Sequence, residues 1–213
     1  MDNTALTVDA RFWDGIAERY AAKPIENVPA YERKLEFTRA RLHPTDVVLD
    51  VGCGTGSLAL TLSEHVSHVH GLDVSSEMVG IAKRKADRAR IRNTTFHHGT
   101  VETRTFAPNT FDVVCAYNIL HLVEDLRGTV QTLARLLKPG GSLVASTVCL
   151  GESWLPYGAL IGAMRWFGKA PRVFIFDKAE LVAELERAGL VDIEQHDVGA
   201  KKTTHFALAT KPA

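Results

Sequence analysis

The fold of this chain is decided by the stretch Val47-Val-Leu-Asp-Val-Gly-Cys-Gly-Thr-Gly56. Its first half has the length and apolar character of a buried strand, and the helical spacing of apolar residues over Ser57–Val66 predicts a helix directly after the glycines. Glycines at a strand-to-helix turn allow a ligand to approach the backbone and leave N–H groups of the helix facing it. The stretch therefore indicates a nucleotide site in an α/β sheet.

Further apolar runs of strand length follow, and they alternate with segments of helical periodicity. This alternation is typical of a sheet with crossover helices, and the scarcity of polar residues within the runs indicates parallel strands covered on both faces. The predicted strands of this kind are Asp46–Val51, Val69–Val74, Thr94–His98, Phe111–Tyr117 and Ser142–Cys149.

Two predicted helices carry recognisable ends. Ser75 is placed to cap a helix that we expect to end in the basic run 83–85, because cations suit the C-terminus of a helix. Asp177 and Glu180 form a capping box that opens a second helix, which Gly189 closes.

The end of the chain holds two more strand-like runs, Val191–His196 and Thr204–Thr210, with a turn-like segment between them. They are close enough in sequence to pair as an antiparallel hairpin. Together with the five earlier runs, they predict an α/β fold whose seven-stranded, mostly parallel sheet ends in an antiparallel C-terminal hairpin.

The composition is that of an ordinary globular chain. The 213 residues are 46% hydrophobic, and 25 basic and 25 acidic side chains balance, so a global positive field for nucleic acid is absent. No apolar stretch reaches the roughly 20 residues of a bilayer span, and the first residues show no secretory signal. The three cysteines form neither a disulfide framework nor a zinc pattern. We expect a soluble, cytoplasmic protein that binds no nucleic acid.

Two nucleotide ligands compete for the glycine loop. Gly54, Gly56 and Ala59 satisfy the dinucleotide pattern G-x-G-x-x-G/A, and Asp73 at the end of the second strand could hold a ribose diol in either case. Asp50, however, stands where a pyrophosphate would lie, and its carboxylate would repel phosphate but attract an ammonium group. S-adenosylmethionine carries an α-ammonium and no phosphate, so the loop favours this cofactor over a dinucleotide.

Four segments carry a resemblance to a known family, and they occur in the family's order and spacing. They are Asp50-Val-Gly-Cys-Gly-Thr-Gly56, Gly71-Leu-Asp-Val-Ser-Ser-Glu-Met78, Phe111-Asp-Val-Val-Cys-Ala-Tyr-Asn118 and Leu136-Leu-Lys-Pro-Gly-Gly141. With them the chain resembles the class I S-adenosylmethionine-dependent methyltransferases, in the broad group that includes ubiquinone and menaquinone biosynthesis methyltransferases. The resemblance implies a Rossmann-like three-layer sandwich that moves a methyl group from S-adenosylmethionine to a small-molecule acceptor.

The same resemblance implies a role for ten residues around the cofactor. Those expected at its methionine end are Asp50, Gly52, Gly54 and Gly56; those expected at the ribose and adenine are Asp73, Val74, Met78, Thr100 and Val101; and Asn118 is expected near the reacting methyl group. Thr100 stands where the family often places an aspartate that binds the adenine amino group. This departure removes a charge and weakens the expectation of adenine contact at that position.

The sequence offers two candidate catalytic residues, although methyl transfer does not require a base because the sulfonium cofactor supplies most of the driving force. His121 follows the fourth strand, in a loop that borders the acceptor pocket in the resembled family; the alternative is a histidine packed under the following helix. Tyr20, like Tyr31, lies in an N-terminal segment that folds over the cofactor in relatives; the alternative is simple packing.

Several histidines lie near one another in the sequence. His65, His68 and His70 straddle a helix end and a strand, so their side chains need not converge, and no metal site is predicted. His97 and His98 point to opposite faces if they lie in a strand, and we interpret them as structural.

The segment Trp154–Phe176 is apolar and aromatic, and three cations interrupt it. One interpretation is a lid packed on the domain. The sharper hypothesis is a cover for an apolar or aromatic acceptor, or transient contact with an anionic membrane surface.

We expect one methyltransferase domain over 1–213, with an N-terminal helical lid (1–45), a cofactor-binding core (46–150), an apolar acceptor-side insertion (151–176) and a C-terminal helix and hairpin (177–213). Two alternative functions stay open at this point: a non-catalytic sensor or scaffold that binds S-adenosylmethionine, and, disfavoured by Asp50, an NAD-dependent oxidoreductase. The acceptor, the methylated atom and the oligomeric state do not follow from the sequence.

Overall fold

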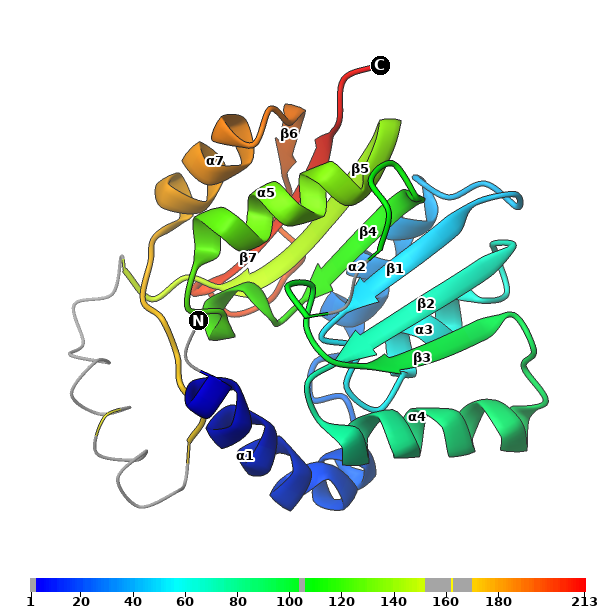
Figure 1. The fold of residues 1–213 in the computed structure, drawn as a ribbon. Coiled ribbons are helices and arrows are strands. Elements are labelled where there is room, and N and C mark those ends of the chain that lie inside the picture. Colours follow the sequence, from blue (N-terminus) through cyan, green and yellow to red (C-terminus); the bar gives the residue numbers. More distant parts are fainter. Residues whose placement is uncertain (1–2, 104–105, 152–161, 163–169) are drawn as a thin grey trace.

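A computed structural model describes residues 3–103, 106–151, 162 and 170–213 of the chain. Its strands form one seven-stranded sheet with the order β3-β2-β1-β4-β5-β7-β6 (Figure 1). The strands are β1 (Val47–Val51), β2 (His68–Asp73), β3 (Thr94–His98), β4 (Phe111–Tyr117), β5 (Leu137–Val148), β6 (Val191–Gln195) and β7 (Thr204–Thr210). The first five strands pair in parallel, whereas β7 is antiparallel to both β5 and β6. The predicted mostly parallel sheet with an antiparallel C-terminal hairpin is confirmed.

Helices cover both faces of this sheet, which makes three layers. The helices are α1 (Asn3–Ala22), α2 (Val28–Arg39), α3 (Ser57–Leu62), α4 (Ser76–Ala89), the short 3-10 helix η1 (Leu120–Leu122), α5 (Leu126–Leu136) and α7 (Lys178–Arg187). One core cluster joins the sheet to α5 and α7, and a second joins it to α2, α3 and α4. None of the described helices is long and apolar enough to cross a membrane.

The strand β4 shows why the middle of its sequence is apolar. Val113 and Cys115 are buried in the cluster beneath α2, α3 and α4, and Val114 and Ala116 are buried in the cluster beneath α5 and α7. Because successive side chains of a strand point to opposite faces, the part of a strand that is covered on both faces is apolar at every position. The charged Asp112 lies near the start of the strand, where it is partly exposed and pairs with Lys138.

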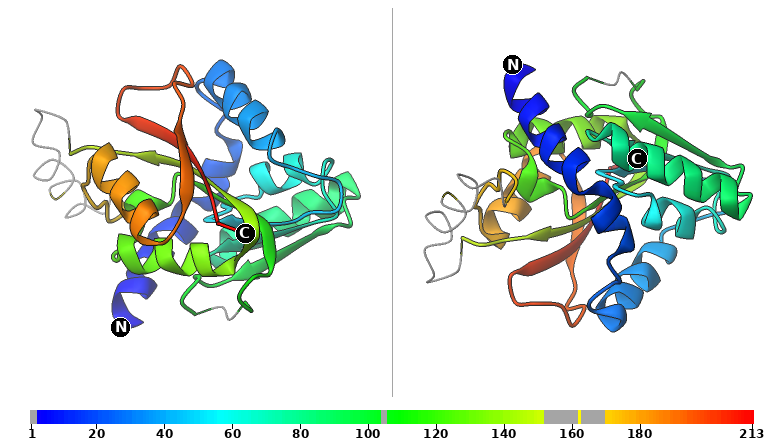
Figure 2. Two further views of the ribbon diagram at one scale, coloured as in Figure 1. Left: turned by 90° about the horizontal axis from the view of Figure 1, so that it is seen from above. Right: turned by 90° about the horizontal axis from the view of Figure 1, so that it is seen from below.

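The helix α1 has a different place from the other helices. It lies across the edge of the sheet to which the carboxyl ends of the parallel strands point, and it contacts α4 (Figures 1 and 2). In α/β sheets this edge is where ligands bind.

The bounds of α4 and α3 correct two expectations. The helix α4 does not end in the basic run 83–85 but continues to Ala89, where Arg90 (φ 57°) provides a left-handed cap. The run therefore lies within the helix and not at its end. The helix α3 ends at Leu62, earlier than predicted, because the Ser63 hydroxyl and the Asn93 side chain take up the local carbonyl groups.

The strand β5 begins at Leu137, five residues before its predicted start at Ser142. The pairing with β4 shifts register here, since Phe111 pairs with Leu137 but Val113 pairs with Ser142, which marks an irregularity in the first part of the strand. Glycine fits this place, since a Cβ on Gly141 would lie 2.8 Å from the Asp112 carbonyl oxygen. The other strands lie within one residue of their predicted bounds, and the capping box of Asp177 and Glu180 is present.

Candidate active site

The glycine loop after β1 has left-handed backbone conformations that favour glycine. Gly52, Gly54 and Gly56 have φ angles of 68°, 52° and 78°. A Cβ on Gly52 would lie 2.9 Å from Ile119, and one on Gly56 would lie 2.8 Å from the Cβ of Ala82. At Gly54 the nearest atom would be the Tyr20 ring, 3.8 Å away. Gly52 and Gly56 therefore allow Ile119 and Ala82 to pack closely against the loop. At Gly54 no atom lies so close, so the backbone beneath Tyr20 is accessible to a ligand.

Asp50 is the most unusual charge of the site. Its side chain is 1% exposed at the end of β1, and its Oδ2 atom has no hydrogen-bond partner. Burial, and then the nearby Asp73 carboxylate, raise the pKa of Asp50 to about 8, against a hydrogen bond from the Ala59 backbone. A buried, unpartnered carboxyl oxygen is costly, and a cation placed beside it would offset that cost.

Asp73 joins the glycine loop to the N-terminus of α4. Its Oδ2 accepts the Gly54 N–H (2.8 Å) and its Oδ1 accepts the Ser75 N–H (2.9 Å). Burial raises the pKa of Asp73, and these two backbone hydrogen bonds oppose the rise. Each carboxylate oxygen has a second lone pair, so Asp73 can still accept from a diol.

The helix α1 is fastened over these acids. Asp14 Oδ1 accepts the Ser75 hydroxyl (2.6 Å) and the Glu77 N–H (3.1 Å), and Ala17 packs with the buried Met78. Burial, and then the charge of Asp73, raise the pKa of Tyr20. The N-terminal helix therefore lies over the residues expected to hold the cofactor.

The residues expected at the adenine are spread around the ends of β2 and β3. Val74 and Thr100 are half-buried, and Val101 belongs to the apolar core. His98, which we interpreted from sequence as structural, binds the Val74 carbonyl through Nε2 (3.0 Å) and stands close enough to Asp73 for its charge to lower the pKa of that acid. Its place at the carboxyl end of a strand next to β2 was the signal that could have marked it.

The candidate residues after β4 lie at the other half of the edge. Asn118 is exposed with a φ of 55° and donates its N–H to the Ser146 carbonyl (2.6 Å). His121 Nδ1 hydrogen-bonds with Thr147 Oγ1 (3.1 Å). Burial lowers the pKa of His121 to about 4, so its ring is neutral at pH 7.

The apolar segment expected to cover the acceptor lies mostly outside the described residues, and this includes Trp154. Its described end contacts the loop after β4, since the Phe174 N–H binds the His121 carbonyl (2.8 Å) and Arg172 pairs with Glu124 (3.1 Å). The Gly151 N–H binds the Phe176 carbonyl (3.0 Å), which brings the two ends of the segment together.

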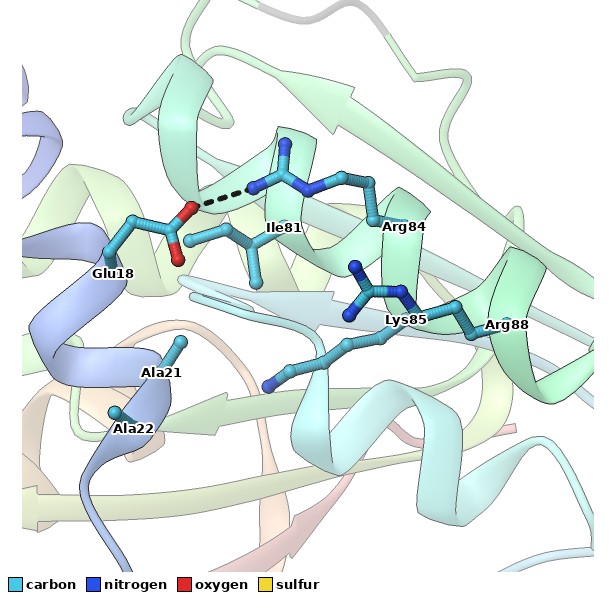
Figure 3. Close-up of a pocket in the computed structure, with 7 residues that line it drawn as sticks. All are labelled: Glu18, Ala21, Ala22, Ile81, Arg84, Lys85 and Arg88. Atoms are coloured by element: carbon cyan, nitrogen blue, oxygen red, sulfur yellow. Dashed lines mark hydrogen bonds and ion pairs between the residues drawn. The ribbon is translucent and has the colours of Figure 1, made fainter.

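A cavity of about 330 Å³ lies behind the glycine loop, between α1 and α4 (Figure 3). Its lining residues are Glu18, Ala21, Ala22, Ile81, Arg84, Lys85 and Arg88. Arg84 pairs with Glu18 across it (2.8 Å), and the Lys85 ammonium donates to the Thr55 hydroxyl of the loop (2.9 Å). Part of the basic run thus supports the loop from behind.

The histidines of β2 and β3 come together more than expected. The rings of His68 and His70 lie 4.7 Å apart, and His70 Nδ1 contacts His97 Nε2 (2.9 Å). Across the described part of the chain, no three histidine, cysteine or acidic side chains are grouped so that they could hold a metal ion.

Sequence reasoning missed one charged residue. Lys34 of α2 is only 9% exposed, and its ammonium donates to the Ser146 hydroxyl (2.7 Å). The spacing of four residues from Ala30 and to Thr38, which are buried on one face of α2, could have indicated that Lys34 is buried.

Known proteins share both the sequence pattern and the fold. The pattern described as "Methyltransferase domain" matches residues 48–141. The ubiquinone biosynthesis O-methyltransferase of Sodalis glossinidius is 32% identical over 198 residues, which cover 90% of this chain and 77% of that protein. The structure of YcgJ from Bacillus subtilis matches with a TM-score of 0.73 at 19% identity, over 86% of this chain and 99% of that one. Phosphoethanolamine N-methyltransferase 2 of Haemonchus contortus, in complex with S-adenosyl-L-methionine, matches with a TM-score of 0.71 at 17% identity, over 86% of this chain and 53% of that one.

The fold and the relatives together define a Rossmann-like α/β methyltransferase. The chain belongs to the family of S-adenosylmethionine-dependent methyltransferases, and S-adenosylmethionine is its cofactor.

Proposed function

We propose that this enzyme methylates a hydroxyl oxygen of a small, apolar or aromatic acceptor. The observation that carries the proposal is the similarity to a ubiquinone biosynthesis O-methyltransferase over 90% of the chain. A second relative with the same name, from Serratia proteamaculans, is 31% identical over 94% of this chain and 84% of its own length. The described end of the apolar segment binds the loop after β4 through the Phe174 N–H, and this contact supports the assignment of the segment to the acceptor side.

We also propose the cofactor roles implied by the family. The unpartnered Oδ2 of Asp50 fits the α-ammonium, and the free lone pairs of Asp73 fit the ribose hydroxyls. The open backbone at Gly54 would lie against the cofactor beneath Tyr20.

The remaining cofactor residues divide by burial. The half-buried Val74 and Thr100 would contact the adenine, whereas Met78 and Val101 are buried by the protein itself and would support the adenine pocket from behind. The exposed Asn118 would border the reacting methyl group.

The cofactor supplies an activated methyl group on a cationic sulfur. The protein therefore has to align the acceptor with this methyl group and to provide for the proton that the acceptor hydroxyl loses. We assign Tyr20 to exclusion of water above the loop, and His121 to the acceptor side. Because burial keeps the His121 ring neutral, it can accept a hydrogen bond from the acceptor without carrying a positive charge.

The domain divisions at residues 45, 150 and 176 are part of the same proposal. A cytoplasmic location and transient membrane contact through 154–176 stay predictions.

The test is incubation of the purified protein with S-adenosylmethionine and a panel of phenols, catechols and aromatic amines, with mass spectrometry of both products. We expect S-adenosylhomocysteine together with a methyl ether. Methylation of amines alone would contradict the hydroxyl acceptor. Cofactor binding without cleavage, with every acceptor class, would favour a sensor.

A further inference from the structure

The buried ammonium of Lys34 lies in the acceptor half, and the proposed function has not used it. In the described part of the chain no carboxylate lies within ion-pair distance of it, and its ammonium hydrogen-bonds only with the Ser146 hydroxyl (2.7 Å). A buried cation without an anionic partner is destabilising, since a hydroxyl replaces little of its lost hydration. Such a group fits a site that an anion enters.

The surroundings of Lys34 place it at the carboxyl edge of the sheet. Its ammonium lies 5.9 Å from the centre of the Tyr117 ring, at the end of β4, and the Tyr117 hydroxyl contacts Thr38 Oγ1 (2.7 Å). Ser146, which Lys34 contacts, also accepts the N–H of Asn118 through its carbonyl (2.6 Å). Lys34 is therefore two hydrogen bonds away from the residue expected beside the reacting methyl group.

Adjacent residues of β5 hold two titratable side chains from opposite faces of the sheet. Ser146 binds Lys34 on the face covered by α2, and Thr147 binds His121 on the face covered by α5. An acceptor above the ends of β4 and β5 would meet both groups.

The position of Lys34 points to the acceptor and not to the cofactor carboxylate. That carboxylate shares a carbon atom with the α-ammonium, so a cation bound to it would also lie close to Asp50. Asp50 stands on β1, whereas Ser146, which binds Lys34, stands on β5, on the far side of β4 and about 10 Å away at the usual strand spacing.

We propose that Lys34 binds and ionises the acceptor hydroxyl, so that the acceptors of this enzyme are phenols or similarly acidic enols. This inference rests on the proposed O-methyl transfer. In the step, the neutral Lys34 amine takes the hydroxyl proton, the oxygen forms a bond to the methyl carbon, and the electron pair of the carbon–sulfur bond passes to sulfur. The ammonium then returns its proton to water. Burial, which lowers the pKa of Lys34, increases the fraction of the neutral amine that can take this proton.

The first test uses 4-nitrocatechol, whose visible absorption reports its ionisation, bound to the complex of the full chain with S-adenosylhomocysteine. We expect the wild type to bind the probe as a phenolate, and Lys34→Met to bind it at least 10-fold more weakly and as the neutral phenol. Lys34→Arg should recover phenolate binding in part, because the positive charge returns. The control is Lys83→Met, on the exposed side of α4, which should match the wild type. Neutral binding by the wild type, or an unchanged spectrum in Lys34→Met, would overturn the inference.

The second measurement separates this role from a structural one. Lys34→Met removes a buried charge and keeps the length of the side chain, so Tm should rise by about 2–4 °C, a typical shift for 1 kcal/mol at this chain length. The Kd for S-adenosylhomocysteine should stay within about 2-fold. A fall in Tm together with loss of S-adenosylhomocysteine binding would show a structural lysine and overturn the inference.

Turnover distinguishes this inference from the proposed function. If wild type and Lys34→Met methylate phenols at equal rates, O-methyl transfer stands and the role of Lys34 falls. If the wild type binds the phenolate through Lys34 but methylates only amines, the hydroxyl acceptor falls and the anion site stands.

Discussion

The two halves of the sheet edge suit ligands of opposite charge. At the ends of β1 and β2 stand two buried acids, Asp50 and Asp73, and the first of them has an oxygen without a partner. Beside the ends of β4 and β5 lie Lys34 and His121. The buried Lys34 has no carboxylate within ion-pair distance among the described residues, and burial keeps His121 neutral. The first half suits a cationic ligand and the second an anionic or acidic one. The sulfonium cofactor and the proposed phenol acceptor would suit these two halves, at neighbouring places along one edge.

A formal net charge of zero therefore conceals a site whose two halves differ strongly in charge. The two halves form no ion pair with each other, since no carboxylate of the described residues lies within ion-pair distance of Lys34. Each half has unfavourable electrostatics of its own that a ligand would relieve, and mutation can relieve each half separately.

The largest expected effect is that of Asp73→Ala on the acidic half. The change removes two backbone hydrogen bonds to the loop and α4 as well as the proposed diol contact. We expect the affinity for S-adenosylhomocysteine to fall by about 2–3 kcal/mol, about 30- to 150-fold, by calorimetry. The exposed acid Glu64, changed to Ala, is the matched control. Equal affinities of Asp73→Ala and wild type would remove Asp73 from the cofactor site.

Asp50→Asn should act on binding and stability in opposite directions. Loss of the carboxylate should weaken S-adenosylhomocysteine binding by about 2 kcal/mol, while removal of a buried ionisable group should leave the apo protein as stable or more so. Calorimetry and thermal melts would check the two signs. A variant that binds normally would break the electrostatic distinction between the two halves.

The stability of the folded protein should depend on pH through Asp50. Burial raises the pKa of Asp50 to about 8, above its value in the unfolded chain. Between about pH 4 and 8 the unfolded chain has lost this proton while the folded protein retains it, so this group lowers the free energy of unfolding as pH rises, by up to about 1.4 kcal/mol per pH unit. Melts of wild type and Asp50→Asn from pH 5 to 8 should diverge accordingly. Parallel curves would mean that Asp50 is ionised in the apo protein.

A smaller effect is expected from His121→Gln in the second half. A glutamine keeps a hydrogen bond to Thr147 but loses the imidazole, and we expect kcat to fall about 10-fold with the cofactor affinity unchanged. Burial lowers the pKa of His121 to about 4, so rate profiles should show no inflection from this residue between pH 6 and 7. Such an inflection, absent in the variant, would place His121 in a more solvated setting than the structure gives.

The smallest effect is expected from Lys85→Met, which changes the support of the acidic half and not its acids. The variant loses the hydrogen bond to Thr55 behind the loop. Since one such bond is worth about 1 kcal/mol, S-adenosylhomocysteine should bind about 5-fold more weakly. Arg88→Met, which changes the same cavity without a hydrogen bond to Thr55, is the control. If both variants bind equally, the contact with Thr55 is irrelevant to the loop.

The acidic half could be predicted from the sequence because its parts are local. The strand, the glycines and Asp50 lie within ten residues, and Asp73 follows one crossover later, so the rule that ligands bind at the carboxyl ends of strands was enough. The parallel direction of the first five strands followed from the alternation of strands and helices, whereas the order of the strands in the sheet was not predicted.

The second half could not be predicted in this way because its contacts are distant in sequence. Lys34 meets Ser146 across 112 positions, and only the packing of α2 against β5 brings them together. In the acidic half, the contact of His98 with the Val74 carbonyl joins β3 to the end of β2 and was likewise not predicted. The end of α4 was mispredicted because a run of cations, taken as a helix end, lies on the exposed side of a longer helix.

The docking of α1 has a consequence for the kinetics of exchange. A molecule bound against the backbone at Gly54 would have to pass the Tyr20 ring when it leaves. Tyr20 belongs to α1, and the hydrogen bonds of Asp14 hold α1 to the start of α4. The other fastening, Glu18 to Arg84, is an exposed ion pair of the kind that salt weakens (Figure 3). We therefore expect the rate of product release to depend on ionic strength through this exposed ion pair, and the affinity to depend on the proposed contacts of the buried acids.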